Sequence, residues 1–240
     1  MTSGIPGRPA PAGSPKRSTP AARISRAALA TNLEAVLAGI DGGVIDVRAD
    51  AWGHGSPFVA RAARDAGAAG VLADESGVAA LRGVVEPALV VTSGPAIDPN
   101  AVFGLSGATL PVLSLHGWVL SLKTLRAGEG VSYGYTHRAS RDTTVALVTG
   151  GYAQGIVRAL GNAASVAIDG RRHPIVGRVA MDVCVVDVGE SRVARGDEVA
   201  FFGDPRTGMP GIGEWVAATG MTAGELAAAV GLRAAREFVP

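Results

Sequence analysis

The sequence predicts a fold of two kinds, an α/β region followed by an all-β region. Between residues 24 and 92, short apolar runs alternate with segments of helical periodicity, which is the pattern of βαβ units with a parallel sheet. From Leu110 onward, short β-type runs are separated by Gly, Asp and Pro turn signals, which is typical of an all-β domain. We therefore expect three parts: a tail at 1–20, an α/β part at 21–109 and a β domain at 110–240.

The α/β part is predicted element by element. Apolar residues recur at helical spacing in residues 24–40, with Ser25 as the N-cap and Gly39 near the end. Two further helices are expected at 57–66 and 75–81, and buried strands at 44–47, 70–73 and 88–92. The Gly-, Pro- and Asn-rich segment 93–107 predicts a loop or linker.

The β domain is predicted from its apolar runs and turns. Strands are expected at 145–148, 166–168, 175–179, 183–188 and 199–202. Asp169-Gly170 and Gly203-Asp204-Pro205 are turn signals. Near the end, Thr222 followed three residues later by Glu225 predicts a capping box and a helix over 222–232.

Composition excludes several classes of function. Hydrophobic residues make up 48% of the 240 and charged residues 18%, which is enough for a sizeable core. The net charge of +1 gives no reason to expect nucleic acid as a partner, and no apolar run is long enough to cross a membrane. The single Cys184 permits no internal disulfide and is compatible with the cytoplasm, where we expect the protein. The proline-rich residues 1–20 lack the apolar block of a secretory signal and predict a disordered tail.

The histidines show no metal-ligand spacing, so no metal site is expected; they are His54, His116, His137 and His173. No glycine pattern matches a dinucleotide-binding fold or a P-loop. Only two lysines are present, Lys16 and Lys123.

Four short segments together resemble alanine racemase, an enzyme family that uses pyridoxal phosphate (PLP). They are residues 44–55 (VIDVRADAWGHG), 131–134 (VSYG), 151–158 (GYAQGIVR) and 176–182 (VGRVAMD). The resemblance begins near Ile24, is densest in the β domain and implies a (β/α)₈ barrel followed by that domain. A full barrel takes about 250 residues, but only about ninety lie between the tail and the β domain. We therefore expect a partial barrel remnant at 21–109.

Arg48 stands where the family has the lysine that forms the Schiff base with PLP. A guanidinium stays protonated and is a very poor nucleophile, so we expect no covalently bound cofactor. Arg48 either binds a carboxylate or phosphate ligand or forms an ion pair with Asp46 or Asp50, since a buried guanidinium needs a partner.

Several other residues match site positions of the family, and one departs from them. Tyr133 matches the tyrosine that the family's partner subunit supplies as an acid/base group, and it is either retained for function or fills a corner of the fold. The residues that match the substrate-binding positions are Tyr152, Met181, Arg158 and Asp182, which either form a carboxylate cradle or hold the β domain together. Gln154 replaces the usual aspartate.

The resemblance also places cofactor contacts at Trp52 and His54. Trp52 replaces a tyrosine near the phosphate, and His54 is a turn histidine, a kind that is more often structural than catalytic. A second phosphate-binding tyrosine of the family aligns with Gly224, where no hydroxyl remains. The family's remaining phosphate loops and its pyridine contact belong to the missing barrel segment.

Two functions follow as hypotheses. The first is a degenerate alanine-racemase-related protein without PLP-dependent activity that acts as a binding or regulatory partner. It would form a homo-oligomer, or a hetero-oligomer with a related racemase subunit, and bind a small amino acid. The alternative is an active racemase that interconverts L- and D-alanine, which would need another lysine, such as Lys123. A folding-defective product is a third possibility.

Overall fold

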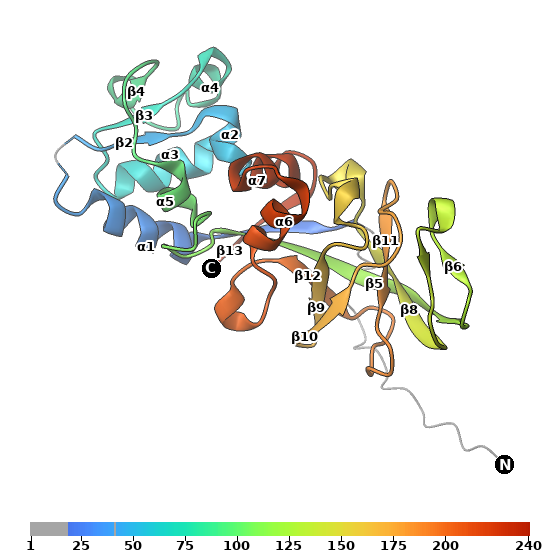
Figure 1. Ribbon diagram of the computed structural model, residues 1–240. Helices are drawn as coiled ribbons and strands as arrows, with labels where there is room; N and C mark the ends of the chain where they lie inside the picture. Colours follow the sequence, from blue (N-terminus) through green and yellow to red (C-terminus); the bar gives the residue numbers. More distant parts are fainter. Residues whose placement is uncertain (1–18, 41) are drawn as a thin grey trace.

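The computed structural model describes residues 19–40 and 42–240, and it separates into a small α/β part and a larger β part (Figure 1). The expected tail at 1–20 lies almost entirely outside the described residues. A partial barrel joined to a β-rich domain is the architecture that the sequence predicts.

The α/β part is built on a parallel sheet of order β2-β3-β4. Its strands are β2 (Val44–Asp46), β3 (Gly70–Leu72) and β4 (Val90–Val91). Its right-handed helices are α1 (Arg26–Leu37), α3 (Ser56–Asp65), α4 (Glu75–Ala80) and α5 (Pro99–Phe103), with a 3₁₀ turn η1 (Pro87–Leu89) before β4. The strand–helix alternation predicted for this part is confirmed.

The helix predicted within residues 24–40 is confirmed as α1 with Ser25 as its N-cap, since the Ser25 hydroxyl accepts from the Ala28 amide at 3.1 Å. The residues before it form β1 (Ala21–Ser25), a strand of the large sheet. Segment 93–107 is not only a loop, because it contains α5, which begins after Asp98 caps the Asn100 amide at 2.9 Å.

The segment that follows β4 covers an edge of the remnant sheet. Ile97 forms an isolated parallel bridge with Ile45, and its amide donates to the Val44 carbonyl at 2.8 Å. Phe103 of α5 is fully buried and stacks on the His54 ring, with centroids 4.1 Å apart. The edge of β2 is therefore covered by this segment, while β4 ends the sheet on its other side.

The β part is an eight-stranded sheet organised around one long strand, β5 (Leu113–Leu125). Its other strands are β1, β8 (Thr143–Thr149), β9 (Ser165–Ile168), β10 (Arg171–Pro174), β11 (Val183–Asp187), β12 (Glu198–Phe202) and β13 (Ala235–Val239). A separate pair, β6 (Gly130–Val131) and β7 (His137–Arg138), lies beside it.

The strand predicted at 175–179 is absent. Ile175 makes only an isolated bridge to Val186, and the chain turns at Gly177, whose φ of +73° favours glycine. The strand here is β10, which pairs with β9 across the predicted Asp169-Gly170 turn. Both turn residues have positive φ, as a two-residue hairpin requires.

Two helices connect the parts. They are α6 (Ile212–Thr219) and α7 (Ala223–Gly231), and α7 begins with the predicted capping box of Thr222 and Glu225. One continuous hydrophobic cluster includes buried residues of the barrel remnant, of α6 and α7 and of the large sheet. The remnant is therefore packed on the β part and does not form a separate core.

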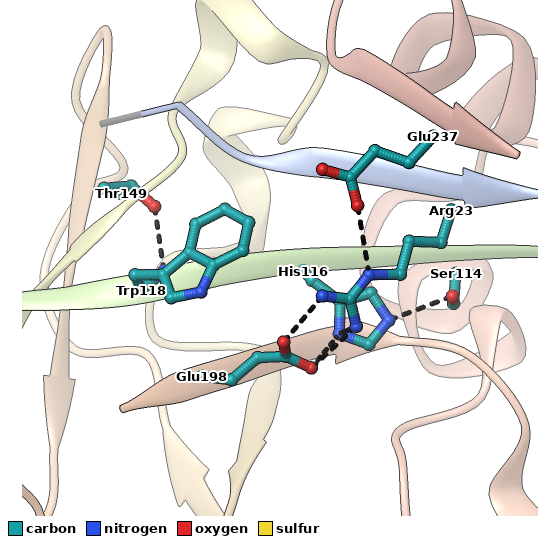
Figure 2. A network of polar contacts seen from close by, with 7 residues as sticks. All are labelled: Arg23, Ser114, His116, Trp118, Thr149, Glu198 and Glu237. Carbon is teal, nitrogen blue, oxygen red and sulfur yellow. Dashed lines mark hydrogen bonds and ion pairs between the residues drawn. The ribbon is translucent and has the colours of Figure 1, made fainter. Parts of the chain in front are cut away.

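A charged network joins four neighbouring strands of the large sheet, β12, β5, β1 and β13 (Figure 2). Arg23 of β1 donates to both Glu198 oxygens at 2.8 and 2.7 Å and reaches Glu237 of β13 at 3.4 Å. The buried His116 of β5 approaches Arg23 at 3.3 Å and Glu198 at 2.8 Å through the same Nδ1. The shorter contact is to an acceptor, so Nδ1 carries the hydrogen and donates to Glu198. Four strands are thus linked by side chains as well as by their ladders.

Candidate functional site

The segment that would carry the cofactor lysine is a single left-handed turn, α2 (Arg48–Trp52). Ala49, Asp50, Ala51 and Trp52 have φ between 50° and 54°, and Gly53 continues at 83°. Each non-glycine residue in this conformation costs roughly 1–2 kcal/mol, so consecutive ones need support from the surrounding structure. Two ion pairs and the packing on α7 give that support.

Arg48 is held by Asp46, which is one of the two pairings that the sequence left open. Its Nε and Nη2 donate to the two Asp46 oxygens at 3.0 and 2.7 Å, and its backbone amide donates to Oδ1 at 3.0 Å. The hydrogen bonds to Asp46 raise the pKa of Arg48 above its usual value. The guanidinium is 53% exposed, so the expectation of a buried arginine is wrong, whereas the carboxylate is 4% exposed. The buried partner is Asp46, which depends on Arg48.

Asp50 and His54 hold the other end of the turn. Asp50 forms an ion pair with Arg236 of β13 and accepts from the Ser56 amide at 2.8 Å. His54 Nδ1 lies 2.9 Å from the Ala51 carbonyl and donates to it. Burial lowers the pKa of His54 to about 4, so the ring is neutral at pH 7. Its fully buried place on Phe103 supports the structural interpretation of this histidine.

Trp52 lies against Gly224 in the first turn of α7. A Cβ added at Gly224 would overlap the indole carbons Cζ3 and Cε3 and lie 3.1 Å from Cη2. The two positions that the resemblance gives to phosphate-binding tyrosines are therefore neighbours in space. They are filled by one indole ring and no second side chain.

The substrate-binding positions gather on loops of the β part. Tyr152 begins the 3₁₀ turn η3 (Tyr152–Gln154). Two backbone hydrogen bonds join this turn to the segment before Asp182: the Tyr152 amide donates to the Ala180 carbonyl at 3.0 Å, and the Ala153 amide donates to the Met181 carbonyl at 2.9 Å. Arg158 lies over the Tyr152 ring at 5.3 Å. The side chains of Tyr152 and Met181 are exposed, Met181 by 55%.

Gln154 explains how this loop tolerates the loss of the usual aspartate. Its Nε2 donates to Asp182 Oδ1 at 2.9 Å, and its Oε1 accepts from the Gly151 amide at 3.0 Å. Asp182 therefore has a structural partner in the loop.

Tyr133 lies beside the same loops. It begins η2 (Tyr133–Tyr135), and the preceding Ser132 donates its hydroxyl to the Arg178 carbonyl at 2.6 Å. Residues 178–182 therefore connect the Tyr133 turn to Met181. Tyr133 is 72% exposed, so it does not fill a corner of this chain. We call Tyr133, Tyr135, Tyr152 and Met181 the open loop surface.

Helix α7 lies beside the left-handed turn α2 (Figure 1). Gly53 lies against Ala227 and Ala228, and Gly155 lies against Ala229 and Val230, so each approaches α7 closely. Within one chain the structure thus brings Arg48, Trp52 and His54 together, and Tyr133 together with Tyr152 and Met181, but not the two groups with each other.

Sequence reasoning did not foresee the Asp50–Arg236 pair or the charged network of Arg23, His116 and Glu198. These contacts join residues between 82 and 214 positions apart in the chain, and no local pattern indicates such pairings. Among the described residues no cluster of three or more His, Cys, Asp or Glu side chains could hold a metal ion. No helix in the described part of the chain is long and apolar enough to cross a membrane.

Comparison with known proteins gives one consistent family. Residues 112–238 match the family model described as "Alanine racemase, C-terminal domain". The alanine racemase of Frankia casuarinae is 42% identical over 149 residues, which are 62% of this chain and 38% of that protein. That of Mycobacterium avium is 46% identical over 124 residues, or 48% of this chain and 32% of that protein. The matches thus span about a third of the length of these curated relatives.

Solved structures show the same fold. The alanine racemase of Streptomyces coelicolor superposes with a TM-score of 0.81 at 21% identity, covering 93% of this chain and 98% of that one. The enzyme from a D-cycloserine-producing Streptomyces lavendulae superposes with a TM-score of 0.82 at 20% identity, covering 94% and 98%. With its β domain matched by sequence and its partial barrel matched by fold, this chain belongs to the alanine racemase family, as a member truncated in its barrel.

Proposed function

We propose that this chain is a racemase-related protein without PLP-dependent activity, which acts as a binding or regulatory partner of a racemase subunit. The observation that carries the proposal is the bidentate pair between Arg48 and the buried Asp46. The residue at the lysine position is engaged in holding its own turn together. A protonated guanidinium in such a pair is not a nucleophile for a carbonyl.

The described residues do not fit the cofactor that the family uses. Arg48 offers no amine, and the indole of Trp52 covers Gly224, where the resemblance implies a phosphate-binding hydroxyl. Lys123, which would have to rescue the chemistry, is exposed on β5 and far along the chain from the left-handed turn. No catalytic step through PLP is therefore assigned to this chain.

The open loop surface supports the binding role. Tyr133, Tyr135 and Met181 are each more than half exposed, although large apolar and aromatic side chains are typical of interface cores. Since the family supplies the counterpart of Tyr133 to a partner subunit, we propose that this surface contacts a second subunit, of this chain or of a related racemase. A small amino acid is the ligand that Tyr152, Arg158 and Met181 would bind in that assembly. We also propose a cytoplasmic location.

The cofactor part is tested by the visible absorption spectrum of the purified protein with added PLP, before and after borohydride reduction and desalting. We expect the chromophore to wash away and no interconversion of L- and D-alanine. Lys123→Arg is the control for adventitious labelling of an exposed lysine. A reducible chromophore retained together with racemase activity would contradict the proposal and favour the active enzyme.

The partner part is tested by analytical ultracentrifugation of this chain, alone and mixed with a complete alanine racemase. We expect sedimentation as an oligomer in at least one of the two samples. Met181→Ser should weaken that association at least tenfold, because it removes an apolar side chain from the open loop surface. Ile40→Ser is the matched control, since Ile40 is 51% exposed but lies beyond α1 in the barrel remnant. A monomer in both samples, or equal loss with the control, would overturn this part.

A further inference from the structure

We infer that Trp52 and Gly224 are a matched pair that closes the place where a cofactor phosphate would be gripped. The inference rests on the proposed loss of PLP chemistry and deepens it. It means that replacing Arg48 by lysine supplies the missing amine without restoring a phosphate site. The place is closed by the packing of Trp52 against Gly224, which are 172 residues apart in the chain.

The first step is steric. Gly224 is buried at the second position of α7, and a Cβ there would lie far inside van der Waals contact with the indole ring of Trp52. The contacted atoms are ring carbons of a large side chain, which cannot turn away as the end of a flexible chain can. Trp52 as oriented in this structure is therefore compatible only with glycine at 224.

The second step concerns the backbone that carries the indole, which is held in place by its neighbours. Trp52 ends the left-handed turn, and the next residue, Gly53, packs so closely on α7 that its own Cβ would lie 2.9 Å from the Ala227 carbonyl oxygen. The Asp46–Arg48 and Asp50–Arg236 pairs hold the turn at both ends. The backbone that carries the indole is therefore held against α7.

The third step is electrostatic. The start of α7 is an end of a helix that favours negative charge, and Glu225 already supplies it. Its carboxylate accepts from the Thr222 amide and hydroxyl, both at 2.8 Å, and the bond from the Thr222 amide lowers the pKa of Glu225. A phosphate would meet an ionised carboxylate beside a closed ring. Shape and charge at this helix end both disfavour an anionic cofactor.

The steric step is tested by thermal unfolding of Gly224→Ala in the wild-type chain and in a Trp52→Ala background, with Trp52→Leu as a second background. We expect Gly224→Ala to lower the midpoint when Trp52 is present. In both truncated backgrounds it should leave the midpoint unchanged or raise it, because alanine is the better helix former. The matched control is Gly213→Ala in α6, where a Cβ meets nothing within 4 Å. Its shift should not depend on residue 52. An equal shift of Gly224→Ala in all backgrounds would overturn the matched pair.

The phosphate step is tested with Arg48→Lys and two probes, PLP and pyridoxal, which lacks the phosphate. After borohydride reduction, mass spectrometry gives the labelled fraction at residue 48 and, as an internal reference, at the exposed Lys123. We expect the PLP-to-pyridoxal ratio at residue 48 to stay within about threefold of that at Lys123. A larger preference for PLP at residue 48 would show that a phosphate site is open there and would contradict the inference. That result would leave the proposed function intact, because it concerns the variant, whereas PLP retained by the wild-type chain would contradict the proposed function itself.

Discussion

The left-handed turn and the open loop surface both carry residues that match the family's site. At the turn their side chains are engaged within the chain, whereas at the loop surface they are exposed. At the turn, every family position is engaged internally: Arg48 with Asp46, Trp52 with Gly224 and His54 with Phe103. At the loop surface, Tyr133 and Met181 extend from a backbone that is itself well bonded. Both side chains are more than half exposed and are therefore available to a partner. Under the proposed function, the turn is the closed half of the family site and the loop surface is its open half.

The largest expected effect is acid sensitivity at the closed half, through His54. The unfolded chain takes up this proton near pH 6.5, but burial lowers the folded pKa to about 4. The unfolded state therefore binds more protons between these values, so stability is full above about pH 6.5 and falls as the pH drops toward 4. The loss is about 3 kcal/mol from this group. Urea unfolding at pH 7.0 and 4.5 measures it.

The matching variants are His54→Asn and His137→Gln. His54→Asn removes the titrating ring and keeps a donor near the Ala51 carbonyl, so its stability should change much less between the two pH values. His137→Gln is the matched histidine control, because His137 lies in β7 outside the buried core. A His54→Asn protein with the wild-type slope would show that another group carries the acid loss.

A smaller effect is expected from the ion pair between Arg48 and Asp46. Arg48→Ala should lower the free energy of unfolding by about 2 kcal/mol, because it leaves the Asp46 carboxylate buried without its guanidinium donors and with only the backbone amide of residue 48. Arg48→Lys should lose less, since an ammonium keeps the charge but not the bidentate geometry. The measurement is urea unfolding at pH 7.

A double-mutant cycle separates this pair from general damage to the turn. Adding Asp46→Ala to Arg48→Ala should recover most of the loss, because it removes the uncompensated charge. If the two substitutions simply add, the contact does not stabilise the turn and the closed half is held by packing alone.

About 1 kcal/mol is expected from Glu198 in the charged network of the β part. The hydrogen bond from His116 and those from Arg23 lower its pKa from 4.5 to about 2. A depressed carboxyl pKa contributes stability above about pH 4.5 that is lost as the pH falls through 2. Because the side chain is nearly half exposed, solvent screening reduces the effect. Glu198→Gln should therefore destabilise at pH 7 and not at pH 2, whereas equal destabilisation at both would contradict the ion-pair account.

Sequence patterns predicted the α/β part where the signals are local. The strand–helix order through residue 92 and the Thr222–Glu225 capping box follow from periodicity and cap chemistry, and both are confirmed. The strands β1 and β13 were missed, because each depends on its pairing with the other and with β5 across the whole chain. Helix α5 was missed because Gly, Pro and Asn predict a loop. The helix is stabilised by tertiary packing, since Phe103 is buried in the core of the remnant.

The sequence identifies which residues belong to the candidate site, but it does not predict which of them contact one another. The family motifs identify Arg48, Tyr133, Tyr152 and Met181, and charge indicates that Arg48 needs a carboxylate. Only the fold shows that Asp46 is the partner, that Asp50 pairs with β13 instead and that Trp52 meets Gly224. These contacts depend on a left-handed turn of four non-glycine residues, a conformation that no propensity predicts.

The smallest effect on stability, and the largest contrast with the closed half, is expected at Tyr133. Its side chain is 72% exposed, so Tyr133→Ser should change the free energy of unfolding by less than about 0.5 kcal/mol. Association with a second subunit should weaken at least tenfold, because a truncated interface tyrosine is a typical hot-spot loss. Tyr133→Phe separates contact area from the hydroxyl: if association survives, the ring makes the contact, and if it fails, the hydroxyl binds a polar group of the partner. Should Tyr133→Ser destabilise the monomer as strongly as Arg48→Ala, the loop surface would be part of the fold, and the contrast between a closed and an open half would fail.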